Sequence, residues 1–268
     1  MEVRLRDYAR GVAVTRSIVI ALLSATVVLA DAASQTPLPE FVDIPAGPFT
    51  MGADRAHDPH AYDNERWPGA SGTGSVNVDR FAISRHEITV AQFTAFARAT
   101  NWRGDSRALE GPPTHPVAFV TWPDALAYCR WLSKQLGRTV RLPTEAEWEK
   151  AARGTDGRIY PWGNEVRRDR ANYENSRTTA VGTHPCPDCA HRLADMSGNV
   201  WEWTSSPYQP YPYDAADDRA NLDADALWVI RGGHYADSAR MIRTTTRTGA
   251  DPGARRPFIG FRVVAASR

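Results

Sequence analysis

The chain has 268 residues, of which 42% are hydrophobic and 10% aromatic, and its formal net charge is +1. A chain of this length forms one large domain or two small ones and can bury a sizeable core. The near-neutral charge argues against a nucleic-acid binder, because such proteins usually carry a strong excess of basic residues. The 9 tryptophans, 19 glycines and 19 prolines favour an irregular fold that is rich in loops.

The N-terminus has the pattern of an export signal. Arginines precede an uncharged apolar run over residues 17–30, and Ala30-Asp31-Ala32 has small residues where a signal peptidase would cut. The run is shorter than the roughly 20 residues that span a bilayer, although a retained membrane anchor is the alternative. We therefore predict a periplasmic or secreted protein that is not membrane-embedded after signal cleavage. The expected segments are a signal peptide (1–32), a linker (33–40) and one folded domain (41–264).

The folded domain is expected to begin with β-structure. Two short strands around a Pro/Gly turn are predicted over residues 41–52, followed by a loop over 53–73 and a strand over 76–84. Four side chains in the loop could bind a metal, but such residues are also common in solvated loops, and we favour the solvated interpretation. These residues are His57, Asp58, His60 and Asp63.

Three helices are predicted from their start signals. Each begins at a threonine that is followed three residues later by an acidic or amide side chain, as in a capping box. The pairs are Thr89 with Gln92, Thr121 with Asp124, and Thr144 with Glu147. In the third helix, Glu145 and Glu149 share one face, and such a pair could act in general acid/base catalysis. Because helix N-termini favour acids without any catalysis, we favour a structural role.

The three cysteines are assigned different states. Cys129 lies on the apolar face of the second helix, which favours a buried structural thiol over a reactive nucleophile. Cys186 and Cys189 are expected to form a disulfide in an oxidising compartment. A thioredoxin-like redox pair would need a strand before it and a helix after it. A zinc site would need two more ligands, for which only His184 and His191 are adjacent.

Residues 195–203 combine two indoles, two carboxylates, an amide and a glycine. Burying Glu202 among apolar neighbours is costly unless the carboxylate is paired or bound to a metal. One interpretation is a calcium site with carboxylates from Asp195 and Glu202 and carbonyls from Gly198 and Val200, because calcium favours flexible oxygen cages. The alternative is a tight turn in which Glu202 pairs with an arginine.

The C-terminal third is expected to contain a long surface loop over residues 205–225 and three further strands. One strand covers 228–231 and leads into a double glycine. A run of β-branched residues predicts a second strand from about residue 242, and a closing strand is predicted over 260–264.

Five sequence blocks resemble the signature of the formylglycine-generating-enzyme, or sulfatase-modifying-factor, family. They occur in the family's order, and the match runs over about residues 41–264. The blocks are 141–149, 160–164, 198–203, 231–233 and 260–262. The resemblance implies a single α+β domain with the mixed, irregular fold of this family, which is similar to C-type lectins and low in regular secondary structure.

The resemblance also implies calcium sites. One family site maps onto Asp195, Gly198, Val200 and Glu202, the four residues that the chemistry of the stretch 195–203 already suggests as calcium ligands. Another would use Asn172 and the carbonyl of Tyr173, but its later acidic ligand should come from a longer insert, and the segment 174–180 is short and has no aspartate. We therefore expect one structural Ca²⁺.

The family's copper chemistry is not expected here. Formylglycine generators carry two cysteines after the double glycine, which bind copper and activate oxygen. Asp237 and Ile242 stand at the corresponding positions, and no cysteine follows Cys189. A Cu(I) site needs thiolates, so no copper site is predicted. The ergothioneine-synthesis branch uses iron and histidines from an added helical domain, for which this chain has no room. The siderophore-maturation branch is exported and lacks the cysteine pair.

These features favour an exported enzyme that oxidatively modifies a peptide or a peptide-derived metabolite, such as a siderophore. The candidate catalytic residues follow the double glycine. They are His234, Tyr235, Asp237, Arg240 and Arg243. Alternatively, the arginines pair with carboxylates of the block 201–203. The alternative functions are a non-catalytic C-type-lectin-like binding module and an envelope assembly module.

Overall fold

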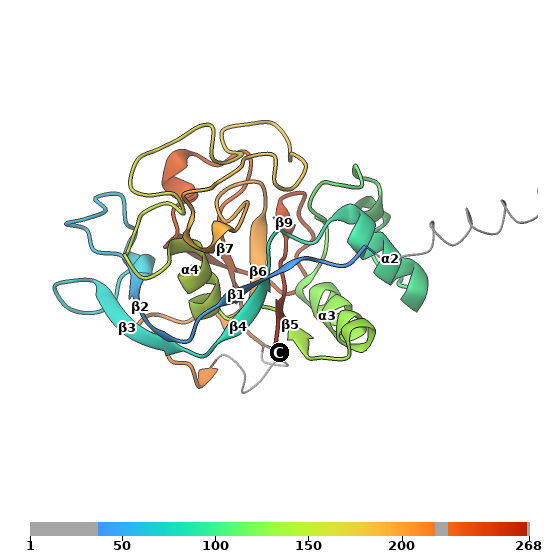
Figure 1. The fold of residues 1–268 in the computed structure, drawn as a ribbon, viewed down its shortest axis with the longest axis horizontal. Coiled ribbons are helices and arrows are strands. Elements are labelled where there is room, and N and C mark those ends of the chain that lie inside the picture. The colour runs from blue at the N-terminus through green and yellow to red at the C-terminus, as the bar shows by residue number, and fades with distance from the viewer. Residues whose placement is uncertain (1–36, 218–224, 267–268) are drawn as a thin grey trace, which may run out of the picture. The chain divides into compact units, whose positions relative to one another are not determined.

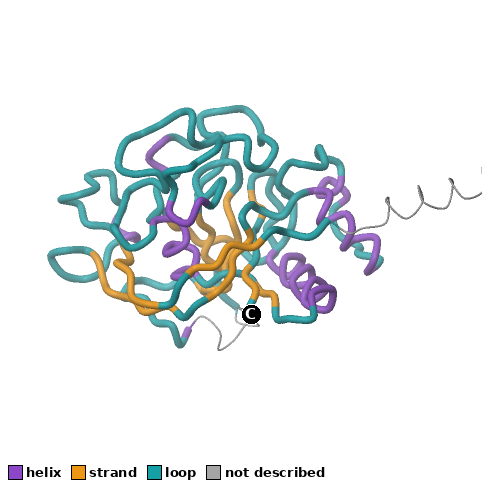
Figure 2. Tube along the Cα trace, viewed as in Figure 1, coloured by secondary structure: helices purple, strands orange, loops and turns teal. Residues whose placement is uncertain are grey.

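The computed structural model describes residues 37–217 and 225–266, so the predicted signal peptide lies outside the described residues. The chain from Leu38 onward forms one structural unit. Figure 2 shows that its helices and strands are short and that loops join them. Within the described residues, no helix has the length and apolar character needed to cross a membrane.

The three predicted helices are confirmed, each with its threonine cap. They are α2 (Val90–Thr100), α3 (Trp122–Leu136) and α4 (Glu145–Arg153). In each helix the threonine side chain accepts a hydrogen bond from the amide three residues on, and that residue's side chain accepts one from the threonine amide. These bonds satisfy amides that have no partner inside the helix. Figure 1 shows α2 and α3 on the same side of the sheets.

The described strands form three sheets. The first contains, in spatial order, β1 (Phe41–Ile44), β4 (Phe81–Ser84), β10 (Val264–Ala265) and β5 (Val140–Arg141). The second pairs β2 (Gly47–Gly52) with β3 (Thr73–Val78). The third contains β8 (Arg247–Ala250), β7 (Trp228–Arg231), β6 (Trp201–Pro207) and β9 (Ile259–Gly260). In this sheet β6 pairs antiparallel with β7 and parallel with β9 (Figure 1).

Short 3-10 turns complete the regular structure of the described residues. They are η1 (Asp63–Glu65), η2 (Ser106–Leu109), η3 (Ala190–Arg192) and η4 (Ala239–Met241).

Three strand predictions differ from the structure. The predicted strand 76–84 is divided between β3 and β4, which belong to different sheets. The predicted closing strand is likewise divided between β9 and β10. The strand expected from about residue 242 begins only at Arg247. Alternation identifies extended backbone, but it does not show where the chain leaves one sheet for another.

The central strand β6 lies between two hydrophobic clusters. Trp201 and Trp203 belong to a cluster that includes side chains of α2 and α3. Glu202, which lies between them in sequence, bonds to Trp148 of α4, and Trp148 belongs to the second cluster. This arrangement follows from the alternation of side chains along a strand. It brings a carboxylate into the interior of the protein.

Candidate functional site

The Glu202 carboxylate forms a two-pronged ion pair with Arg262. Arg262 Nε donates to Oε2 at 2.6 Å and Nη2 donates to Oε1 at 2.7 Å, and both side chains are buried. Trp148 Nε1 donates to Oε2 at 2.7 Å. The predicted pairing of Glu202 with an arginine is therefore present. Buried charges require such compensation.

Two further buried acids lie near Arg262. Burial raises the pKa of Glu87 well above its ordinary value, the charges of Asp195 and Glu202 raise it further, and Arg262 opposes the rise. Burial also raises the pKa of Asp195, which the Gly182 amide and Arg262 oppose. One oxygen of each acid, Glu87 Oε2 and Asp195 Oδ1, is buried without a hydrogen-bond partner. Three carboxylates thus surround one guanidinium, so the cluster favours an additional positive charge or a bound proton.

A tight backbone turn at Gly198 precedes β6. Gly198 has φ 77°, and a Cβ there would lie 2.2 Å from the carbonyl oxygen of Asn172, so the close approach needs glycine. Asp195 accepts a bond from the Gly182 amide at 2.6 Å through Oδ2, which leaves Oδ1 for another partner. Within the described residues, no three His, Cys, Asp or Glu side chains are grouped so that they could hold a metal. A calcium ion would therefore depend on few carboxylates and on main-chain carbonyls.

The residues of the other implied calcium site are both buried. The side-chain amide of Asn172 donates to the carbonyl of Arg177 and to Asn199 Oδ1, and its oxygen accepts a bond from Asn175. Tyr173 packs beside Ile242 in a small hydrophobic cluster. The Asn172 side chain is therefore already used to hold the turn.

The segment after the double glycine brings three of the candidate catalytic residues together. The amide of His234 donates to Asp237 Oδ2 at 2.9 Å, and His234 Nε2 lies 3.4 Å from Oδ1. His234 Nδ1 accepts a bond from the amide of Ala236 at 3.1 Å, so the ring proton is on Nε2, facing Asp237. Burial lowers the pKa of His234, while Asp237 opposes this shift. The imidazole is therefore neutral near pH 7.

Aromatic groups form the surroundings of this histidine. Its ring stacks on Phe258 with centroids 4.5 Å apart, and Tyr235 meets it edge-on at 5.1 Å. Backbone bonds attach the segment to the rest of the site, because the amide of Tyr235 donates to the carbonyl of Asn199 and the amide of Asn175 donates to the carbonyl of Tyr235. His234 and Asp237 therefore form a half-buried polar pair, and the rings of Phe258 and Tyr235 pack against the imidazole.

The two candidate arginines lie in different environments. Arg240 is exposed, 5.7 Å from the ring of Tyr62. Arg243 is fully buried and pairs with Asp58 at 2.7 Å and with Glu65 at 2.6 Å. The prediction that these arginines pair with carboxylates of the block 201–203 is therefore wrong, because Arg243 pairs with Asp58 and Glu65 instead. The prediction that Asp58 is solvated is also wrong, because its side chain is buried. The assignment of the two arginines to catalysis stays a prediction.

The two carboxylates on α4 have the structural role that we favoured. Glu145 binds the guanidinium of Arg247 through both oxygens, at 2.6 and 2.8 Å. Glu149 pairs with Arg231 at 2.5 Å and with Arg153 at 2.9 Å. All of these side chains are buried. The pairs with Arg247 and Arg231 connect α4 to the third sheet, whereas the pair with Arg153 lies within α4.

The segment after the double glycine contains none of the three cysteines. Ile242 is fully buried in a hydrophobic cluster, and Asp237 is engaged by His234. Cys129 is buried in the core, where burial raises the pKa of its thiol to about 12. The other two cysteines form a disulfide.

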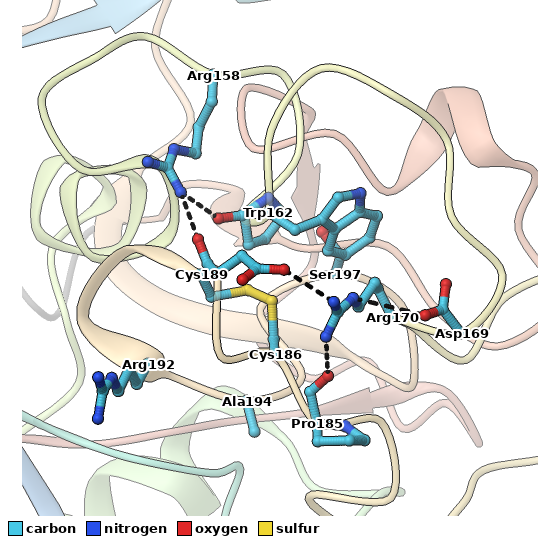
Figure 3. The surroundings of a disulfide bond; sticks show 12 residues. Arg158, Trp162, Asp169, Arg170, Pro185, Cys186, Cys189, Arg192, Ala194 and Ser197 are labelled. Carbon is cyan, nitrogen blue, oxygen red and sulfur yellow. Dashed lines mark hydrogen bonds and ion pairs between the residues drawn. A yellow bond between two sulfur atoms is a disulfide. The ribbon is translucent and has the colours of Figure 1, made fainter.

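The disulfide between Cys186 and Cys189 is confirmed, with Cα atoms 5.2 Å apart. Figure 3 shows the side chains of Arg158 and Arg170 reaching the loop that it closes. Arg158 donates to the carbonyl of Asp188 at 2.9 Å, and Arg170 donates to the carbonyl of Pro185 at 2.8 Å. The loop is therefore held by hydrogen bonds as well as by the disulfide.

Removing the disulfide by Cys186→Ser with Cys189→Ser is expected to lower the free energy of unfolding by roughly 2 kcal/mol, because the closed loop is short. Urea unfolding of the protein, with and without reductant, measures this loss. The double variant is the control, since reductant should not affect it. In the unfolded, unreduced protein we expect one free thiol, that of Cys129, and three free thiols would contradict the disulfide.

Two residues that contact the candidate site, Glu87 and Phe258, were not predicted from the sequence. Glu87 precedes the α2 cap and carries no local signal of burial, although its Oε1 accepts a bond from Asn199 at 3.1 Å. Phe258 lies in a loop before β9, and only the fold places it against His234. Arg262 is part of a recognised block, but its role as the partner of Glu202 depends on tertiary contact.

A model of the sulfatase-modifying factor enzyme 1-like domain matches residues 26–267. A hercynine oxygenase from Mycolicibacterium thermoresistibile is 32% identical, covering 81% of this chain and 56% of that protein. The inactive C-alpha-formylglycine-generating enzyme 2 of Mus musculus is 29% identical, covering 85% of this chain and 86% of that protein. The solved structure of PvdO from Pseudomonas aeruginosa has a TM-score of 0.70 and 28% identity, and the match covers 85% of this chain and 95% of PvdO.

The fold and the central strand thus define a single-domain α+β protein of the formylglycine-generating-enzyme type, as predicted. The chain belongs to the family of the sulfatase-modifying factor enzyme 1-like domain.

Proposed function

We propose that this chain is an exported enzyme that oxidatively modifies a peptide or a peptide-derived metabolite, such as a siderophore. The observation that carries the proposal is the half-buried pair of His234 and Asp237, between Tyr235 and Phe258. This segment corresponds to the one in which the family's generators carry their copper-binding cysteines. The similarity to a hercynine oxygenase supports oxidative chemistry, because that relative is named as an oxygenase.

The geometry indicates what each side chain contributes. Asp237 fixes the orientation of His234, and the Ala236 amide fixes its tautomer. The Nε2 proton then faces a carboxylate, and a neutral imidazole held in this way can donate a hydrogen bond to a substrate oxygen that displaces the Asp237 contact and gains negative charge during the reaction. Phe258 stacks on the imidazole and Tyr235 meets it edge-on, so both rings restrict the orientation of His234. The chemistry proposed here does not use cysteine-bound copper.

Oxygen uptake tests the proposal directly. The exported protein is incubated with a library of peptides and siderophore precursors, while dioxygen consumption and product mass are recorded. His234→Ala is expected to reduce uptake by about 10²-fold, because it removes a hydrogen-bond donor to the charge that develops during the reaction. Arg98→Ala, an exposed change on α2 outside the candidate site, is the control and should retain activity. Equal uptake by wild type and His234→Ala, or no uptake with any compound, would overturn the assignment.

A second candidate is a non-catalytic binding or envelope assembly module of the C-type-lectin-like type. Two observations favour it: both His234 nitrogens are already engaged, and one relative of similar length is named as inactive. Binding of a library compound without oxygen uptake or any product would establish this alternative. Export, a peptide-derived partner and the absence of a nucleic-acid partner are part of both proposals.

We also propose one structural Ca²⁺ at the turn before β6. Asp195 would provide its unpartnered Oδ1, and Gly198 and Val200 would provide carbonyls. Glu202 Oε1 accepts a single bond from Arg262 and retains a lone pair. The unbalanced negative charge around Arg262 supports a cation at this place.

Calcium is expected to raise the melting temperature and chelator to lower it. At a hundredfold excess over Kd, binding stabilises the folded state by about 2.7 kcal/mol. Asp195→Asn should abolish the calcium response, while Asp43→Asn, an exposed change on β1, should leave it intact. Thermal unfolding with calcium or chelator measures both. If the wild-type melting temperature ignores both additions, Glu202 serves only as the partner of Arg262.

A further inference from the structure

A cavity of about 440 Å³ lies between the loops 63–69 and 208–211. None of the residues that line it belongs to the segment of His234 and Asp237. Its size is within the range of small-molecule sites. Three of its lining residues are aromatic: Trp67, Tyr208 and Tyr211.

The aromatic walls are held in place by their surroundings. The guanidinium of Arg247 lies 4.9 Å from the ring centroid of Tyr208 and 4.3 Å from that of Tyr211, and Glu145 holds it by two bonds. The rings of Trp67 and Tyr211 are 5.7 Å apart. Trp67 also packs against Gly74, where a Cβ would lie 2.3 Å from the indole. A ligand would thus meet ring faces that are already positioned, which reduces the entropy cost of binding.

The charges that line the cavity leave one cation uncompensated. Glu145 neutralises Arg247, and Arg55 pairs with Asp63 at 2.9 Å. Among the described residues, Arg66 forms no ion pair, and its Nε is buried without a hydrogen-bond partner. The cavity therefore combines aromatic surface with a guanidinium whose geometry suits a carboxylate.

We propose that this cavity binds an aromatic carboxylate, with the ring against Trp67, Tyr208 and Tyr211 and the carboxylate against Arg66. A free aromatic acid and the C-terminal aromatic residue of a peptide share this chemistry. The site goes beyond the proposed oxidative activity, because it uses other residues and requires only binding.

Calorimetric titration of the full chain with three probes tests the proposal. N-acetyl-L-tyrosine carries both ring and carboxylate, N-acetyl-L-tyrosinamide lacks the charge, and N-acetyl-L-alanine lacks the ring. The acid is expected to bind about tenfold more tightly than the amide, since a bond to a charged group is worth about 1.4 kcal/mol or more. The alanine derivative should bind weakly or not at all. Equal affinity for acid and amide, or no binding of the acid at millimolar concentration, would overturn the proposal.

Variants assign the binding to the cavity. Arg66→Gln should remove the preference for the acid, and Arg66→Lys should retain part of it. Arg80→Gln, an exposed arginine outside the cavity, is the control and should change nothing. If Arg66→Gln binds the acid as the wild type does, the site is elsewhere and the proposal fails. His234→Ala should leave these affinities unchanged, so failure of this site and failure of the oxidative function are separable.

A short peptide that ends in tyrosine distinguishes the two sources. Tighter binding of the peptide than of N-acetyl-L-tyrosine, lost on C-terminal amidation, would support a peptide terminus as the ligand. Equal binding of the two would support a free aromatic acid.

Discussion

Replacing Arg262 with methionine is expected to lower the free energy of unfolding by about 3–5 kcal/mol, because it removes one partner of a buried ion pair. Arg262 is fully buried and holds both oxygens of Glu202. It is also the cation that opposes the raised pKa values of Glu87 and Asp195. Its loss removes the guanidinium that acts on all three buried acids. Equilibrium unfolding in urea measures the effect.

Two variants make this result specific. Arg80→Met breaks the exposed pair of Arg80 and Asp43 and should change the unfolding free energy by at most about 1 kcal/mol. Combining Arg262→Met with Glu202→Gln should recover part of the loss, because it removes the unpaired charge and leaves Trp148 an acceptor. If Arg262→Met lowers the free energy of unfolding no more than Arg80→Met does, the pair of Arg262 and Glu202 does not stabilise the fold as we expect.

Replacing Arg243 with methionine is expected to cost a similar amount, about 3–5 kcal/mol. Arg243 binds Glu65 through two nitrogens at 2.6 and 2.7 Å and Asp58 at 2.7 Å, with no exposure to solvent. Without it, two carboxylates of the loop before β3 are buried unpaired. The expected signature is a lower urea midpoint, and any loss of oxygen uptake should follow from unfolding.

Arg240→Met provides the matched control for Arg243→Met. It lies three residues earlier in the same segment but is exposed, so its removal should have little effect on stability. A catalytic arginine would behave differently, because its variant would unfold like the wild type and still lose activity. If Arg243→Met unfolds like the wild type but loses activity, the structural role is wrong and Arg243 remains a candidate catalytic residue.

The helices could be predicted from sequence because their signals are local. A capping box joins residues three positions apart, so Thr89, Thr121 and Thr144 each mark a helix start without reference to the rest of the fold. The disulfide is equally local, since Cys186 and Cys189 are three residues apart. The family and its fold class were predictable because five blocks, including the one around Glu202, occur in the family's order.

The tertiary structure alone decided the sheet membership of the strands and the partners of the buried charges. The pairing of Arg243 with Glu65 joins residues 178 positions apart, and that of Arg262 with Glu202 spans 60. Sequence could therefore indicate that Glu202 needs a partner, but it could not choose Arg262 over Arg243. It also gave no sign that Glu87 would be buried beside Asp195, or that Phe258 would stack on His234. Local bonding is determined by spacing along the chain, whereas compensation of a buried charge depends on which distant segment the fold packs against it.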